Sequence, residues 1–284
     1  FDLCGIARCR SLERQYDRFK NWLADGCDGG LEYLRRNTGK RFDPGALCEG
    51  ARSVIVCGVG YHRPPSAHEV ASRIASYAHS RDYHLTIRER LNELSAYLRE
   101  LVPGASGRVF TDTAPLAEKS WAVEAGLGWI GRNSLLANPR LGSFLLLGEV
   151  VTTAELEPDA PFVRDGCGTC RACVDACPVA AIRPDRTIDA GRCISRRTIE
   201  TGDGDEGDLH GWLFGCDVCQ RACPYNRKAP VSVHDSFAPL AELERLDVDD
   251  WLGLDEAGFR RIFGETPLAR CGLRRLQERI RRLK

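Results

Sequence analysis

The 284-residue sequence has no methionine, no net charge and no apolar run long enough to span a membrane, which takes about 20 residues. Its 40 basic and 40 acidic residues balance, so the total charge gives no indication of an acidic partner. No secretory signal is visible, and we therefore predict a soluble cytoplasmic protein. Because the chain begins with Phe1 in what resembles the middle of an element, we expect that residues precede it.

Cysteine, in contrast, is abundant, with 14 residues in the chain. Four cysteines form the run C-x2-C-x2-C-x3-C-P of bacterial [4Fe–4S] ferredoxins, in which the fourth cysteine ligates the other cluster of a pair. A half-motif, C-x2-C-x3-C-P, lies downstream, and Cys193 supplies its missing ligand. The crossing rule assigns one cluster to Cys167, Cys170, Cys173 and Cys223, and the other to Cys177, Cys193, Cys216 and Cys219.

Two other interpretations of these cysteines fit less well. Structural zinc sites use four cysteines in paired C-x2-C spacing, which differs from a tight triplet with a crossing half-motif. A disulfide framework is typical of secreted proteins. The remaining cysteines show no ligand spacing, and most are expected to be small buried apolar residues: Cys4, Cys9, Cys27, Cys48, Cys57 and Cys271.

Upstream of the cysteine motifs, strand and helix patterns alternate irregularly. Two continuous apolar runs, Ser53–Gly60 and Ser143–Val151, predict buried strands. Further patterns predict a strand over Arg108–Thr111 and helices over Leu12–Leu23, Leu31–Arg36, Asp82–Glu100 and Pro115–Ala125. We predict an α+β protein that begins with a three-layer α/β domain.

A glycine-rich stretch follows the last of these helices. Gly126, Gly128 and Gly131 match G-x-G-x-x-G, but they follow a predicted helix rather than a strand, which argues against a dinucleotide site. They form either a tight turn or a place where the backbone approaches something large and flat.

Asp112 lies at the end of a predicted strand. It is either a catalytic acid or the N-cap of the next helix, and capping is the commoner role for such an aspartate. His84 and His62 have no metal-ligand spacing, so a surface or core role is expected for both.

Taken together, several stretches resemble the epoxyqueuosine reductase family. They are Phe110–Lys119 (FTDTAPLAEK), Ala125–Ser134 (AGLGWIGRNS), Gly148–Glu149, the first cysteine run, Arg192–Ser195 (RCIS), Phe214–Gln220 (FGCDVCQ) and Cys223–Lys228 (CPYNRK). The resemblance implies an oxidoreductase that reduces epoxyqueuosine to queuosine at the wobble position of tRNA. It also implies two cofactors, cobalamin and a pair of [4Fe–4S] clusters.

The resemblance further implies roles for individual residues. Asp112 matches the family's proton donor, and Lys119 resembles its basic residue near the corrin. Residues that resemble the cobalamin pocket, or that flank cluster cysteines and are expected to face the corrin or substrate, are Trp129, Gly131, Asn133, Ser134, Ser195 and Gln220. Expected partners are the anticodon stem-loop of tRNA carrying epoxyqueuosine and an external low-potential electron donor. The chain is expected to be a monomer without membrane contact.

We therefore predict three parts. Residues 1–158 form a cobalamin-binding catalytic domain, residues 159–230 a ferredoxin-like domain with both clusters, and residues 231–284 a helical C-terminal segment with possible tRNA contact. Within this last segment, residues 259–284 carry nine basic and two acidic side chains. The final helix is either a packed amphipathic helix with a solvated basic side or a phosphate-contacting element.

Two other functions remain open from the sequence. One is a ferredoxin-like electron carrier without a substrate of its own. The other is a related corrinoid iron–sulfur reductase, such as a dehalogenase, which would share the cofactors but act on a different substrate.

Overall fold

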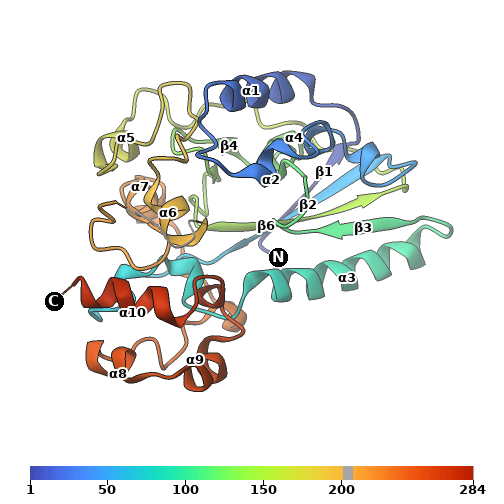
Figure 1. Ribbon diagram of the computed structural model, residues 1–284. Helices are drawn as coiled ribbons and strands as arrows, with labels where there is room; N and C mark the ends of the chain where they lie inside the picture. The colour runs from blue at the N-terminus through green and yellow to red at the C-terminus, as the bar shows by residue number, and fades with distance from the viewer. Residues whose placement is uncertain (201–206, 284) are drawn as a thin grey trace.

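A four-stranded antiparallel sheet forms the centre of the protein (Figure 1). The structure is a computed structural model that describes residues 1–200 and 207–283. The strands lie in the order β1-β2-β6-β3. Their bounds are β1 (Leu3–Arg8), β2 (Ser53–Gly60), β3 (Gly107–Phe110) and β6 (Leu145–Thr152). The two apolar runs of the sequence form the two central strands, β2 and β6, because central strands are covered on both faces.

Helices cover both faces of this sheet. One face carries α1 (Glu13–Ala24) and α4 (Glu118–Glu124), and the other carries α3 (Tyr83–Leu101) (Figure 1). Since side chains alternate along a strand, Leu147 and Val151 of β6 pack in the core under α4, while Leu146 and Val150 pack in the core under α3. The predicted α+β class and its three layers are confirmed.

The sequence prediction was wrong at the start of α4. Pro115 does not begin the helix, because residues 112–117 form a series of tight turns in which the N–H of Leu116 donates to the carbonyl of Ala114 at 2.8 Å. The N–H of Ala117 then donates to the carbonyl of Arg41 at 2.8 Å, and α4 begins one residue later. Strand β1 was not predicted from the sequence.

The glycine-rich stretch forms a tight connection between α4 and a small hairpin of β4 (Trp129–Ile130) and β5 (Leu136–Ala137). Gly126 has a φ of 77°, a conformation that favours glycine, and a Cβ on Gly128 would lie 2.1 Å from the carbonyl oxygen of Ala137. This is the turn interpretation, and no parallel βαβ unit surrounds it in the described part of the chain.

The cysteine-rich part contains short helices joined by loops. These are α5 (Ala172–Ala176), α6 (Ile194–Glu200) and α7 (Val218–Arg221), and α5 packs against α7. A short helix, α2 (Glu32–Arg35), follows α1 (Figure 1). Of the six cysteines outside the motifs, Cys4 is exposed, Cys9 is partly buried and the other four are buried.

The last three helices form a separate apolar core beside the sheet (Figure 1). They are α8 (Val248–Gly253), α9 (Glu256–Phe263) and α10 (Leu273–Arg281), and they share this core with residues near Val70 and Phe214. The apolar stripe of α10 is buried as predicted, but Arg279 is only 2% exposed and donates to the carbonyl of Leu213 at 2.6 Å. That arginine stabilises the fold and is not a phosphate contact.

No helix in the described residues has both the length and the apolar character that a bilayer crossing requires.

Replacing Gly148 with alanine tests the packing of α3 on the sheet. A Cβ there would lie 2.6 Å from Cγ2 of Ile87 and 2.7 Å from Cδ1 of Leu91, so α3 has to shift. We expect Gly148→Ala to lower the free energy of unfolding by roughly 1–3 kcal/mol in denaturant titrations. Gly253→Ala is the matched control, because nothing lies within 4 Å of its added Cβ. Equal stability of the two variants would contradict this packing.

Candidate active site and cysteine module

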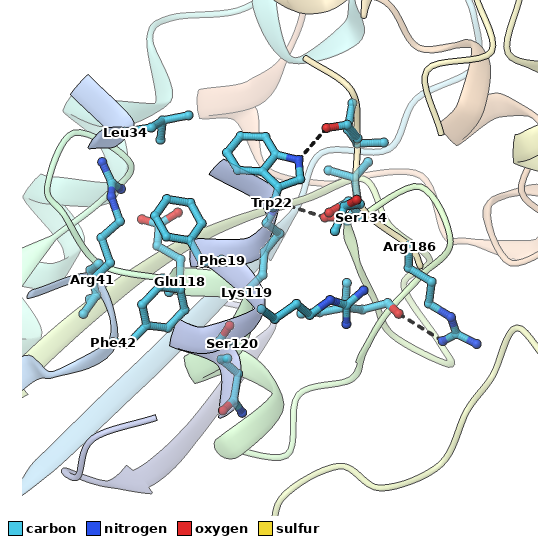
Figure 2. Close-up of a pocket in the computed structure, with 18 of the residues that line it drawn as sticks. Phe19, Trp22, Leu34, Arg41, Phe42, Glu118, Lys119, Ser120, Ser134 and Arg186 are labelled. Atoms are coloured by element: carbon cyan, nitrogen blue, oxygen red, sulfur yellow. Dashed lines mark hydrogen bonds between the residues drawn. The ribbon is translucent and has the colours of Figure 1, made fainter. Parts of the chain in front are cut away.

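A cavity of about 480 Å³ lies between α1, the start of α4 and the β4–β5 hairpin. Figure 2 shows the aromatic rings of Phe19, Trp22 and Phe42 close together, and Lys119 and Ser134 also line the cavity. Charged side chains from distant parts of the chain also line it: Arg18, Arg41, Asp112, Glu118 and Arg186. The cavity therefore combines aromatic surface with both signs of charge.

Asp112 projects from the turn between β3 and α4. Its φ of 52° lies in the left-handed region, which is strained for a residue with a side chain. The N–H of Asp112 donates to Oε1 of Glu118 at 2.5 Å, and this contact holds the turn in place. Because α4 begins at Glu118, Asp112 does not cap the helix. The capping interpretation is wrong, and 51% of the side chain stays exposed at the cavity.

The carboxylate of Asp112 accepts hydrogen bonds from the first turn of α3. The hydroxyl of Tyr83 lies 3.0 Å from Oδ2 of Asp112, and Nε2 of His84 lies 3.2 Å from the same oxygen. The other ring nitrogen of His84 lies 2.6 Å from Oδ1 of Asp82. An imidazole between two carboxylates is stabilised in its charged form, since both of its nitrogens can then donate.

The proton in this group therefore belongs to the histidine. The hydrogen bond from His84 and its positive charge lower the pKa of Asp112. Burial lowers the pKa of His84, but the carboxylates of Asp112 and Asp82 raise it to about 9. The pair holds one proton at neutral pH, on His84 rather than as a protonated Asp112.

Three of the residues expected at the corrin line this cavity: Lys119, Asn133 and Ser134. The ammonium of Lys119 donates to the carbonyl of Ser134 at 2.8 Å, across the cavity floor. Burial lowers the pKa of Lys119, while the neighbouring Glu118 and Asp112 raise it. Ser134 has a φ of 61°, so its carbonyl is turned out of the regular hairpin path.

Two more of the expected residues lie beside the cysteines instead. The indole N–H of Trp129 donates to Sγ of Cys167 at 3.4 Å. A Cβ on Gly131 would lie 3.8 Å from the same sulfur and 2.9 Å from Oδ1 of Asn133. Trp129 and Gly131 thus contact the cysteine module, and Asn133 lies at the boundary between the module and the cavity.

Ser195 and Gln220 are not among the residues that line the cavity. Gln220 is 7% exposed, and its amide donates to the carbonyl of Ser143 at 2.8 Å, which fixes one loop of the cysteine module to the segment that leads into β6. Ser195 lies in the first turn of α6, where its N–H interacts with the sulfur of Cys193. The structure does not bring these two residues to Asp112.

The motif cysteines fall into two groups of four. The first group lines a cavity of about 540 Å³ and consists of Cys167, Cys170, Cys173 and Cys223. In the second group, burial raises the pKa of Cys216 to about 12, and negative charge on Cys193 and Cys177 adds to the effect. Burial also raises the pKa of Cys219, together with the charges of Cys216 and Cys193. The four cysteines of the first group are those that the crossing rule brings together from the spacing, and the ligation of each cluster stays a prediction.

Among residues 1–200 and 207–283, no group of three or more His, Cys, Asp or Glu side chains is arranged to hold a single metal ion.

The partners of Asp112 were not predicted from the sequence. His84 was expected to be a surface or core residue, and Tyr83 and Glu118 were not singled out. The hydrogen bond from His84 spans 28 positions and the one from Tyr83 spans 29, so no local spacing reports them. Glu149 was not singled out as a functional residue either. The sequence did contain a reason to do so, because Glu149 is a charged residue within a run predicted to be buried.

Comparison with known proteins agrees with this architecture. A family model described as epoxyqueuosine reductase QueG, DUF1730, matches residues 41–113, and one described as a 4Fe-4S double cluster binding domain matches residues 166–226. The epoxyqueuosine reductase of Cyclobacterium marinum is 40% identical, and the match covers 99% of this chain and 91% of that protein. The predicted pair of [4Fe–4S] clusters is confirmed at the level of the domain.

Solved structures give the same result. A crystal structure of epoxyqueuosine reductase with an epoxyqueuosine-modified tRNA-Tyr stem loop has a TM-score of 0.87 at 26% identity, covering 98% of this chain and 76% of that one. A Bacillus subtilis epoxyqueuosine reductase, captured with a catalytic aspartate loop swung out of its active site, also has a TM-score of 0.87 at 26% identity, with 98% and 76% coverage. The chain therefore belongs to the epoxyqueuosine reductase family.

Proposed function

We propose that this protein reduces epoxyqueuosine to queuosine in tRNA, using cobalamin and electrons that pass through two [4Fe–4S] clusters. One observation carries the proposal. Asp112, which is hydrogen-bonded to His84, lines one cavity, and the first cysteine group lines a second cavity. The two cavities share Asn133. Proton donors and an electron path therefore meet at one place. Family membership supplies the reaction that requires both.

The reaction sets the number of protons that the site must supply. Conversion of an epoxide to an alkene breaks two C–O bonds, forms a C=C bond and releases the oxygen as water, which consumes two electrons and two protons. The His84–Asp112 pair holds one proton beside the cavity. A histidine and a carboxylate in hydrogen-bond contact are suited to general acid catalysis.

The cavity residues fit a corrin. Lys119, Asn133 and the backbone of Ser134 present polar groups on one side, and a corrin carries amide side chains around its rim. When bound, cobalamin supplies a strongly reducing, nucleophilic cobalt centre. Lys119 and Ser134 would hold its edge, while Trp129 and Gly131 would pack between it and the first cluster.

The aromatic part of the cavity wall is suited to bind a nucleoside. The rings of Phe19 and Trp22 lie 5.6 Å apart at an angle of 22°, next to the guanidinium groups of Arg18 and Arg41. Proteins that bind an unstacked base use aromatic and guanidinium planes for stacking, and cations for the flanking phosphates. We propose that the modified base binds here. We further propose that the protein acts on tRNA in the cytoplasm, is a monomer and receives electrons from an external donor.

A ferredoxin-like carrier is the alternative of a different class. A carrier needs clusters near its surface, but it does not need a strained aspartate, a histidine between two carboxylates and a cavity beside them. Strain of this kind is retained where function requires it. The Asp112 group therefore favours the enzyme.

Double cysteine variants test the crossed ligation. If Cys167 and Cys223 bind the same cluster, replacing both with serine removes that cluster and leaves about four of about eight irons. Replacing Cys167 and Cys177 removes a ligand from each cluster and disrupts both. Iron content and EPR spectra of the anaerobically reconstituted proteins distinguish these results. The reverse pattern would assign Cys177 to the first cluster.

Asp112→Asn tests the acid group. The variant keeps the shape of the side chain, so we expect it to retain iron and cobalt. Because asparagine cannot pair with His84 as an anion, we expect epoxide reduction to fall at least about 100-fold. Conversion of epoxyqueuosine-tRNA is followed by nucleoside mass spectrometry. Asp17→Asn, at a carboxylate that is 67% exposed, is the control. Full activity of Asp112→Asn would exclude a role in proton donation.

The pH profile tests His84. Its pKa is raised from 6.5 to about 9, so its stabilising charge is fully present below pH 6.5 and is lost as the pH rises through about 9. We expect single-turnover rates to fall on that alkaline side, and His84→Gln to lower the rate and remove this limb. His62→Gln is the control, because the ring of His62 contacts a backbone carbonyl, that of Pro230 at 3.3 Å, and not the carboxylate of Asp112. An unchanged alkaline limb in His84→Gln would assign the titration to another group.

A further inference from the structure

A buried glutamate lies behind the active site, on the central strand β6. Glu149 pairs with Val56 of β2 and Phe110 of β3, and its side chain is 0% exposed on the face covered by α4. In the described part of the chain, no N–H group, hydroxyl or cationic side chain donates a hydrogen bond to either of its carboxylate oxygens. An ionised carboxylate in this position would lack both water and a partner, which is strongly unfavourable.

Helix α4 packs on β6, and its first residue, Glu118, brings a second carboxyl group to the face of β6 from which Glu149 projects. The two carboxyl groups interact with each other. A hydrogen bond between two carboxyl groups requires a proton on one of them, because neither can donate when ionised. Glu118 also lines the cavity, and its Oε1 accepts the N–H of Asp112. The two glutamates therefore form a line from the interior of the sheet to the wall of the active site (Figure 2 shows Glu118 in this wall).

We propose that Glu149 and Glu118 store and deliver the second proton of the reduction, with Glu149 acting through Glu118. This inference rests on the proposed function. In the step, the O–H bond of Glu118 breaks and a new O–H bond forms on the departing oxygen, which leaves as water after the His84–Asp112 pair has given the first proton. The proton of Glu149 then moves to the Glu118 carboxylate. No electrons are exchanged in either transfer.

The charged surroundings support protonation of both glutamates. Burial raises the pKa of Glu149 well above 4.5, and negative charge on Asp112 adds to this effect. Burial also raises the pKa of Glu118 to about 8, as does the charge of Asp112, while Lys119 and His84 lower it. From β2, the thiol of Cys57 also interacts electrostatically with Glu149. Glu149 is therefore a positioning residue that holds a proton, and it does not touch the substrate.

Infrared spectroscopy of the holoenzyme detects these protons without turnover. We expect wild type at neutral pH to show the carbonyl band of buried protonated carboxyl groups, shifted in D2O, and Glu149→Gln to lose one component of it. Glu93→Gln, at an exposed glutamate of α3, should retain the full band. Absence of the band from wild type, or an unchanged band in Glu149→Gln, would overturn the proposal.

Stability against pH gives a second test. A carboxyl whose pKa is raised from 4.5 to about 8 binds a proton in the folded state that the unfolded state releases. Folding is therefore favoured below pH 4.5, and this contribution is lost as the pH rises towards 8. We expect the unfolding midpoint of wild type to fall over this range more steeply than that of Glu149→Gln. Parallel curves would overturn the proposal.

Turnover separates this inference from the proposed function. In single-turnover assays we expect Glu149→Gln and Glu118→Gln each to lower the rate at least tenfold, with little change in tRNA affinity and with iron and cobalt retained. Wild-type rates in both variants would overturn the proton route. If wild-type holoenzyme itself fails to convert epoxyqueuosine-tRNA, the proposed function fails, while the infrared and stability results still decide whether the glutamates hold protons.

Discussion

The hydrogen bonds of Asp112 connect the main parts of the active site. Its carboxylate joins the end of β3 to the first turn of α3 through Tyr83 and His84, and its N–H joins the same turn to Glu118 of α4. Arg270, from the C-terminal helical part, also lowers the pKa of Asp112. The hydrogen bonds of one residue therefore join elements from both faces of the sheet, and a positive charge from the C-terminal helical part acts on it.

The carboxyl groups of the site differ in the direction in which their pKa values are shifted. Asp112 is paired with a cation, and its pKa is lowered, whereas Glu118 and Glu149 lack a cationic partner strong enough to offset burial, and their pKa values are raised. The two effects support each other, because the negative charge of Asp112 disfavours a second charge nearby. Environments that separate carboxyl pKa values in this way are typical of acid–base catalysis.

Local patterns predicted the central strands and the proximity of Cys167, Cys170, Cys173 and Cys223, because both depend on the pattern of residues along the chain. Features that depend on distant partners were missed. The turns before α4 need the carbonyl of Arg41, far upstream, and the role of His84 needs Asp112, on another element. Strand β1 was missed because its burial at the sheet edge is irregular. For Asp112, the position of α4 decided between the two interpretations. Glu149 differs, since a charged residue in a doubly covered strand has no ordinary structural explanation and can be marked as a functional candidate from its pattern alone.

The arrangement of charge suggests why protons are stored away from the cysteines. Each electron that enters a cavity of low dielectric adds a negative charge, which is unfavourable unless a proton accompanies it. The first cysteine group reaches the cavity through Asn133, and the proton-holding groups reach it through Asp112 and Glu118. In the proposed reaction, electrons and protons would therefore reach the substrate from different walls of the cavity. A site built this way keeps its net charge nearly constant through a two-electron reduction, so no single step has to bury an uncompensated charge.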